Sequence, residues 1–95
     1  MTLELISSKL CLGCKQLKQL MKKAGIEFEE VDVSTLSMGD IAEILTDIRM
    51  SGYVAAPDLE LPVIRNSSTG DVIPASVLMS HYSDEQLLDM IRGIK

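Results

Sequence analysis

The 95-residue sequence is poor in aromatic residues, in cysteine and in positive charge. Aromatic residues make up 3% of the chain and Trp is absent, so the sequence lacks a platform on which nucleic-acid bases could stack. Acidic residues outnumber basic residues, and the net charge of -5 disfavours nucleic acid as a partner. Because aromatic rings are so few, aliphatic residues and the six Met must fill the core.

Long apolar stretches are also missing. No segment approaches the roughly 18 apolar residues that a membrane span needs, and the residues after Met1 form no basic and apolar leader. Two cysteines are too few for the disulfide framework of a small secreted protein. We therefore expect a cytoplasmic protein without a membrane partner, in which a close cysteine pair is catalytic or metal-binding rather than structural.

Length and composition predict one globular domain over residues 1–95, because 46% of the residues are hydrophobic and 24% are charged. Apolar periodicity predicts an α/β chain with the element order βαβαββα. The strands are expected at 2–6, 26–33, 61–64 and 71–73, and the helices at 14–25, 37–50 and 83–94. The apolar phase of the second strand slips between Phe28 and Val31, which predicts a bulge there.

Local signals at the ends of the expected helices support these boundaries. Gly25 is suited to a left-handed C-terminal cap. Ser37 with Asp40 is the pattern of a capping box, and Ser83 with Gln86 repeats it before the last helix. Residues 51–60 have no clear period and form a loop longer than usual, which is typical of functional loops.

The two cysteines occur together as Cys11-Leu12-Gly13-Cys14, between the first strand and the first helix. A helix N-terminus presents free N–H groups and the positive end of the helix dipole to the first sulfur. Such sites lower the pKa of a cysteine from about 8.5 to about 3.5–7.5, and the thiolate is the form that attacks a disulfide. We therefore predict that Cys11 is the nucleophile and that Cys14, shielded by the helix, resolves the mixed disulfide.

Four neighbours of the cysteines are candidates for substrate binding. Leu12 offers an apolar contact beside the sulfur, and Gly13 permits a tight turn and a close approach of the substrate backbone. Lys9 and Lys15 flank the pair and favour a thiolate. Residues 1–25 hold five basic residues and one acidic residue, whereas the remainder holds four basic and thirteen acidic residues, so the redox end favours acidic partners.

The cysteine pair leaves other interpretations open. A CxxC motif also occurs by chance, and cysteines can bind a metal or an iron–sulfur cluster. A zinc site needs four ligands, whereas the chain has no further Cys and only His81, so it would require a carboxylate or a second subunit. We predict no metal ligands, and we interpret His81 as an exposed loop residue.

Several segments together resemble the glutaredoxin family over nearly the whole chain: the first strand, the cysteine motif, the lysine-rich helix, residues 25–33 and Leu61-Pro62-Val63-Ile64. The resemblance implies the minimal thioredoxin fold, a four-stranded mixed sheet with three helices, and dithiol–disulfide exchange with electron transport through the two cysteines. It also implies a cis proline before the third strand. Pro62 matches that position, with Pro57 as the alternative, and Leu61 would then offer its backbone to a bound substrate.

The sequence departs from the family pattern at three places. Leu12-Gly13 stands where familiar members have Pro-Tyr or Pro-Thr. Residues 75–80 read Ala-Ser-Val-Leu-Met-Ser, where the family usually has a Gly-Gly turn and acidic residues that hold glutathione. Asp84 is interpreted as a helix-capping residue. The loop at 51–60 resembles the variable region of glutaredoxin-like proteins that serve particular reductases, and we expect it to set partner choice.

The resemblance thus predicts a monomeric thiol–disulfide oxidoreductase that needs no bound cofactor and reduces disulfides of proteins or glutathione mixed disulfides. Electrons would come from glutathione or from a thioredoxin-reductase-type enzyme. Two alternatives remain. One is a non-enzymatic carrier that binds a metal or an iron–sulfur cluster through the same cysteines. The other is an adaptor that kept the fold, lost turnover and binds partners through the loop around Tyr53.

Overall fold

The computed structural model describes residues 3–53, 59–80 and 82–94. Its elements are β1 (Leu3–Ser7), α1 (Leu12–Lys23), β2 (Glu29–Asp32), the 3₁₀ turn η1 (Val33–Thr35), α2 (Met38–Met50), β3 (Val63–Asn66), β4 (Val72–Ile73), α3 (Ala75–Leu78) and α4 (Asp84–Ile94). The predicted succession is present, with η1 and the short helix α3 added to it. Pro57 and His81 lie outside the described residues.

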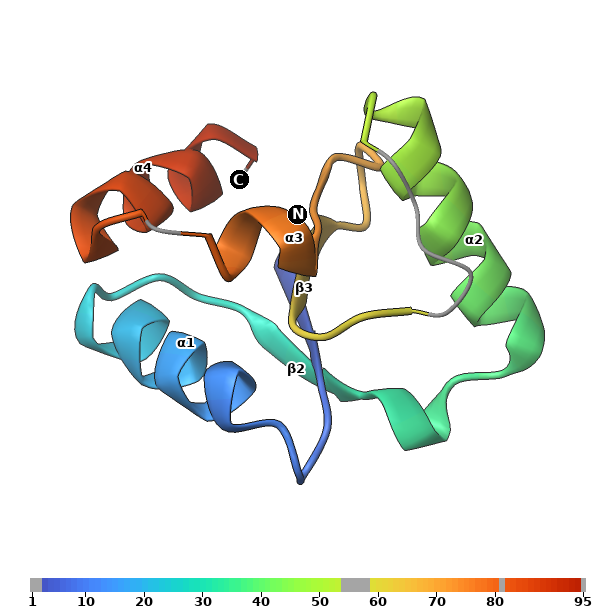
Figure 1. Ribbon diagram of the computed structural model, residues 1–95, viewed down its shortest axis with the longest axis horizontal. Coiled ribbons are helices and arrows are strands. Elements are labelled where there is room, and N and C mark those ends of the chain that lie inside the picture. The colour runs from blue at the N-terminus through green and yellow to red at the C-terminus, as the bar shows by residue number, and fades with distance from the viewer. Residues whose placement is uncertain (1–2, 54–58, 81, 95) are drawn as a thin grey trace.

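The strands form one mixed sheet in the order β2-β1-β3-β4. β1 runs parallel to β2 and antiparallel to β3, and β3 runs antiparallel to β4. Helices α1 and α4 lie on one side of the sheet and α2 lies on the other (Figure 1). This arrangement confirms the predicted α/β class with a four-stranded mixed sheet.

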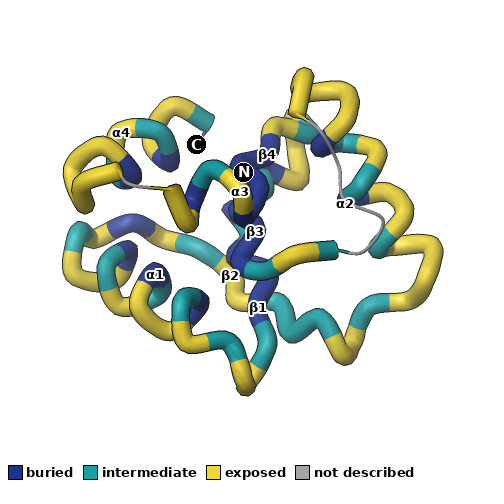
Figure 2. The backbone as a smooth tube through the Cα atoms, viewed as in Figure 1, coloured by how far each residue is buried: buried dark blue, intermediate teal, exposed yellow. Residues whose placement is uncertain are grey.

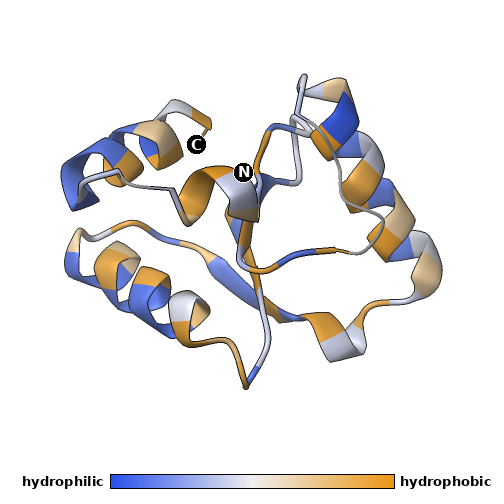
Figure 3. Cartoon of the chain, in the orientation of Figure 1, coloured by the Kyte–Doolittle hydropathy of each residue, from blue (hydrophilic) through white to orange (hydrophobic). Residues whose placement is uncertain are grey.

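Alternating residues of the strands contribute to two separate hydrophobic cores, because successive side chains of a strand point to opposite faces of the sheet. Leu5 and Ile64 pack with the buried residues of α1 and α4, whereas their neighbours Ile6 and Val63 pack with those of α2. Figure 2 shows the buried strands between helices whose outer surfaces are exposed. Figure 3 shows apolar and polar residues interleaved along α1, α2 and α4, as expected for amphipathic helices.

The helices begin and end at the capping residues that the local sequence predicts, except at the start of the first helix. α1 begins at Leu12 rather than at Cys14, because Cys11 is its N-cap. At its other end Gly25 has a φ of 74°, and the N–H groups of Gly25 and Ile26 donate to the carbonyls of Lys22 and Met21, which is a Schellman motif. The two capping boxes, before α2 and before α4, are confirmed by their paired hydrogen bonds.

Two strand predictions are wrong at their ends. The second strand was expected at 26–33, but Ile26 and Phe28 reach the core from an extended segment outside the ladder, and β2 covers only Glu29–Asp32. β2 pairs residue for residue with β1, so it contains no bulge. The third strand was expected at 61–64, but it begins after Pro62, which has no N–H to donate to a ladder.

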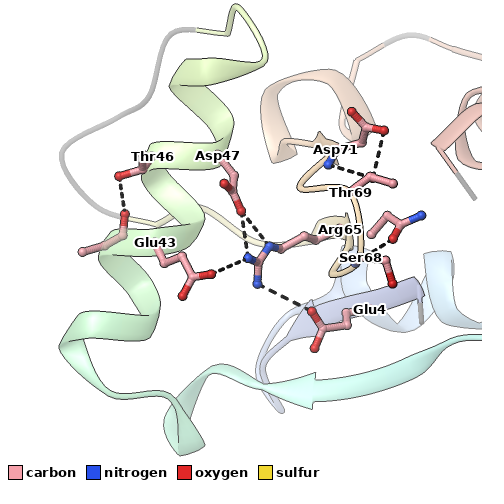
Figure 4. Close-up of polar contacts among 10 residues, drawn as sticks. Glu4, Glu43, Thr46, Asp47, Arg65, Ser68, Thr69 and Asp71 are labelled. Atoms are coloured by element: carbon pink, nitrogen blue, oxygen red, sulfur yellow. Dashed lines mark hydrogen bonds and ion pairs between the residues drawn. The ribbon is translucent and has the colours of Figure 1, made fainter. Parts of the chain in front are cut away.

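Arg65 connects the sheet to α2 (Figure 4). Its guanidinium donates to Asp47 at 2.8 Å and to Glu43 at 2.9 Å, and it lies 3.7 Å from a carboxylate oxygen of Glu4 on β1. Burial lowers the pKa of Arg65, but the hydrogen bonds and charges of Glu43 and Asp47 outweigh burial, so the pKa is raised overall. This ion-pair cluster lies on the α2 side of the sheet. On β3 Arg65 is paired with Glu4, near the start of β1, whereas the cysteine loop follows the other end of β1.

Candidate active site

The two cysteines lie where the loop after β1 enters α1. Cys11 has an extended backbone and caps α1, and its sulfur accepts a hydrogen bond of 3.1 Å from the backbone N–H of Cys14. The two residues form a disulfide, with their Cα atoms 5.2 Å apart. The sequence folds in this way because the chain turns from β1 into a helix at Cys11, which leaves the N–H groups of the first helical turn free for a side-chain acceptor.

The two sulfurs differ in their access to solvent. Cys11 is half-buried, whereas Cys14 is 2% exposed and packs inside the first turn of α1. An incoming disulfide therefore meets Cys11 first. This asymmetry is the one that a nucleophile and a resolving thiol require.

Two exposed leucines flank Cys11 in the chain. Leu10 is 98% exposed and Leu12 is also exposed, although both are large and apolar. In Figure 3 the loop between β1 and α1 becomes apolar as it enters the helix. Leu12 was predicted from the sequence as an apolar contact beside the sulfur. Leu10 was missed, although an apolar residue in a short loop directly before Cys11 was a usable signal.

Gly13 has a different structural role from the one expected. Its backbone is helical, and within the described residues the left-handed glycines are Gly25, Gly52 and Gly70, so the expectation of a tight turn at Gly13 is wrong. Its missing side chain instead leaves room for Met79. A Cβ on Gly13 would lie 2.8 Å from Cε and 3.0 Å from Sδ of Met79, so the end of that flexible side chain would have to move aside. No local sequence pattern predicts this contact, because the fold alone brings Met79 to Gly13.

Lys9 and Lys15 are placed on the Cys14 side of the motif. They line, together with Cys14, a cavity of about 330 Å³ that is completed by Ser7, Ser8, Lys18, Glu30 and Asp32. Lys18 forms an ion pair of 3.1 Å with Glu30. The pKa of Asp32 is lowered, mainly by the hydrogen bond from the backbone N–H of Ser34 and to a smaller extent by the charge of Lys9.

Pro62 and the cysteines share one end of the sheet. The Leu61-Pro62 bond is cis, as the sequence comparison with the family implied. Val63, which follows directly, lies opposite Ile6, and β1 then leads through Ser7 to the cysteine loop. Pro62 is buried and Leu61 packs against the core on the α2 side. A contact of Leu61 with substrate remains a prediction.

The described parts of the chain contain neither a metal-binding cluster nor a helix that could span a membrane. Residues 3–53, 59–80 and 82–94 contain no group of three or more His, Cys, Asp or Glu side chains that could hold a metal ion. Over the same ranges, none of the helices combines the length and the apolar character needed to cross a membrane.

A four-stranded mixed sheet, a CxxC disulfide at the N-terminus of the first helix and a cis proline before the third strand define a protein of the thioredoxin-fold superfamily. The family model for glutaredoxin matches residues 3–60, and the chain belongs to the glutaredoxin family. Family and cysteine pair together indicate thiol–disulfide redox chemistry.

A comparison with solved structures agrees with this assignment at the level of the fold. The chain is similar to the crystal structure of a glutaredoxin from Archaeoglobus fulgidus, with a TM-score of 0.58 and 18% sequence identity. The match covers 96% of this chain and 86% of the other chain. A search of curated protein sequences finds no significant match.

Proposed function

We propose that this protein is a thiol–disulfide oxidoreductase that reduces disulfides of other proteins by dithiol exchange. The observation that carries the proposal is the position of the Cys11 sulfur, which caps α1 and accepts the N–H of Cys14, while Cys14 itself is buried. A helix N-terminus stabilises negative charge within its first turn, so reduced Cys11 is favoured as a thiolate.

The first step is attack of the Cys11 thiolate on one sulfur of the substrate disulfide. The substrate S–S bond breaks, a Cys11–substrate mixed disulfide forms, and the other substrate sulfur leaves as a thiolate that takes a proton from water. The N–H of Cys14 is already directed at the Cys11 sulfur, so the attacking atom is held in position before the substrate arrives.

The second step is attack of Cys14 on the Cys11 sulfur. Cys14 loses its proton, the mixed disulfide breaks, and the second substrate thiolate leaves as the Cys11–Cys14 disulfide forms. The substrate has then gained two electrons and two protons, and the protein is in the oxidised form seen here. Two electrons from glutathione or from a thioredoxin-reductase-type enzyme return it to the dithiol.

The surroundings of the site support a protein rather than glutathione as the oxidised substrate. Exposed Leu10 and Leu12 offer apolar contacts that a small charged tripeptide does not need. Residues 75–78 form the helix α3, where the family usually has a Gly-Gly turn that holds glutathione. The protein acts as a cytoplasmic monomer in this proposal, and the lysines of residues 1–25 favour acidic partners.

The test compares turnover of a small disulfide, bis(2-hydroxyethyl) disulfide, and of a protein disulfide by the wild type, Cys11→Ser and Cys14→Ser. Cys11→Ser should lower both rates to that of the uncatalysed exchange. Cys14→Ser should accumulate a mixed disulfide on Cys11 that is visible by mass spectrometry. Ala42→Ser, at an exposed position of α2, serves as the matched control. Wild-type rates in Cys11→Ser would refute the proposal.

A further inference from the structure

We infer that the cavity between α1, α3 and α4 is a subsite for an apolar side chain of the protein substrate, next to the substrate's reacting cysteine. This inference rests on the proposed function and names the class of substrate that the site prefers. The cavity has a volume of about 410 Å³ and borders the cysteine motif, since Gly13 is one of its lining residues.

The cavity has an apolar floor and a balanced polar rim. Its floor consists of leucines from three helices: Leu17, Leu20, Leu78 and Leu87. Its polar lining comprises Gln16 and Gln19 with one basic residue, Lys23, and one acidic residue, Asp84. These opposite charges leave the lining without a net charge, so it does not attract a guest that carries a net charge. Sites that bind an apolar group have this composition, an apolar interior with a few polar groups around it.

Met79 packs over Gly13, and the two residues form the wall of this cavity at the cysteine motif. The terminal methyl and sulfur of Met79 occupy the space where a side chain of residue 13 would stand. Met79 is exposed, and a methionine side chain is flexible and polarisable, so it can adjust its shape to a guest. The end of the Met79 side chain can therefore move away from Gly13 and let a guest pass from the cysteine motif into the cavity.

The covalent chemistry fixes which part of a substrate reaches the cavity. The substrate cysteine is bonded to Cys11 in the mixed disulfide, and the Cα atoms of Cys11 and Cys14 are only 5.2 Å apart, with Gly13 adjacent to Cys14. Successive residues of the substrate are about 3.8 Å apart. We expect a residue next to the substrate cysteine to enter the cavity past Gly13 and Met79, where a leucine or phenylalanine side chain suits the leucine floor.

The experiment measures kcat/KM for the reduction of disulfide-bonded peptides that differ only in the residue beside the cysteine, Leu or Ser. The wild type should favour the Leu peptide by about tenfold or more, the range of discrimination by apolar pockets. Met79→Ala removes the adaptable wall, and Gln16→Trp places a large side chain at an exposed position in the lining. Both should bring the Leu/Ser ratio close to one, mainly through KM.

Met50→Ala is the matched control, because Met50 is an exposed methionine at the end of α2 and does not line the cavity. It should keep the wild-type ratio. A wild-type ratio near one, with bis(2-hydroxyethyl) disulfide still reduced, would overturn the subsite and leave the proposed function standing. A high ratio that neither Met79→Ala nor Gln16→Trp changes would also overturn it. Failure of the wild type to reduce any disulfide would refute the proposed function, and the subsite with it.

Discussion

Replacing Arg65 by Met tests whether stability and redox chemistry reside in different parts of the molecule. Methionine keeps an apolar stem on β3 but removes the guanidinium that contacts Glu4, Glu43 and Asp47. The Arg65 side chain is only 14% exposed, and Glu4 and Asp47 are also largely covered. The substitution therefore leaves two poorly solvated carboxylates without their partner.

The magnitude follows from the burial of each partner. Removing one member of a fully buried ion pair costs about 3–5 kcal/mol, whereas a surface pair contributes about 0–1 kcal/mol. Glu43 is 64% exposed and contributes little. Glu4 and Asp47 lie between the two limits, so we expect Arg65→Met to lower the free energy of unfolding by about 2 kcal/mol.

Urea unfolding of the oxidised protein measures this loss. Arg92→Met is the control, because Arg92 contacts Asp89 at 3.8 Å on an exposed face of α4, and it should cost less than about 0.5 kcal/mol. Reductase activity of folded Arg65→Met should equal that of the wild type. Equal unfolding free energies for the two arginine variants, or loss of activity in a folded Arg65→Met protein, would refute the reasoning.

Two further predictions concern stability. Asn66 is 1% exposed and joins the β3–β4 turn to α4, because its side chain accepts from the N–H of Ser68 and donates to the carbonyl of Ile94. Asn66→Ala should therefore lower the free energy of unfolding by about 1–3 kcal/mol in urea titrations. An unchanged unfolding midpoint would contradict this. Hydrogen bonds from the backbone N–H groups of Ser34 and Ser37 lower the pKa of Asp32 and Asp40 from 3.8. Their folded-state pKa lies below the unfolded one, so their stabilisation is complete above about pH 4 and is lost as the pH falls through the lowered pKa. The urea midpoint should therefore fall in acid, and less so in Asp40→Asn; an equal acid-induced fall in that variant would refute the assignment to Asp40.

Much of the fold could be predicted because its signals are local. The capping box at Ser37 and the left-handed cap at Gly25 depend on a few neighbouring residues, and both are present. The limits of β2 were mispredicted because a strand ends where its partner ends, and apolar Ile26 and Phe28 pack into the core without joining the ladder.

In the candidate site, too, the features set by local sequence could be predicted, whereas those set by the fold could not. The position of Cys11 as a helix cap could be predicted from the strand-to-helix junction in the sequence, and the cis bond at Pro62 could be predicted from the family resemblance. The contact of Met79 with Gly13 joins residues far apart in the chain, so no local pattern could reveal it. The placement of Lys9 beside Asp32 likewise depends on how β2 pairs with β1.

The most direct test of the central claim is the ionisation of Cys11. In reduced Cys14→Ser, Cys11 is the remaining cysteine, and residue 14 keeps the backbone N–H that donates to the Cys11 sulfur in the wild type. The rate of alkylation by iodoacetamide, measured against pH, reports the thiolate. We predict that the alkylation rate is half-maximal at a pH within about 3.5–7.5, well below the ordinary cysteine pKa of about 8.5. A half-maximal rate at about pH 8.5 or above would contradict it, because Cys11 would then be an ordinary thiol rather than an activated nucleophile.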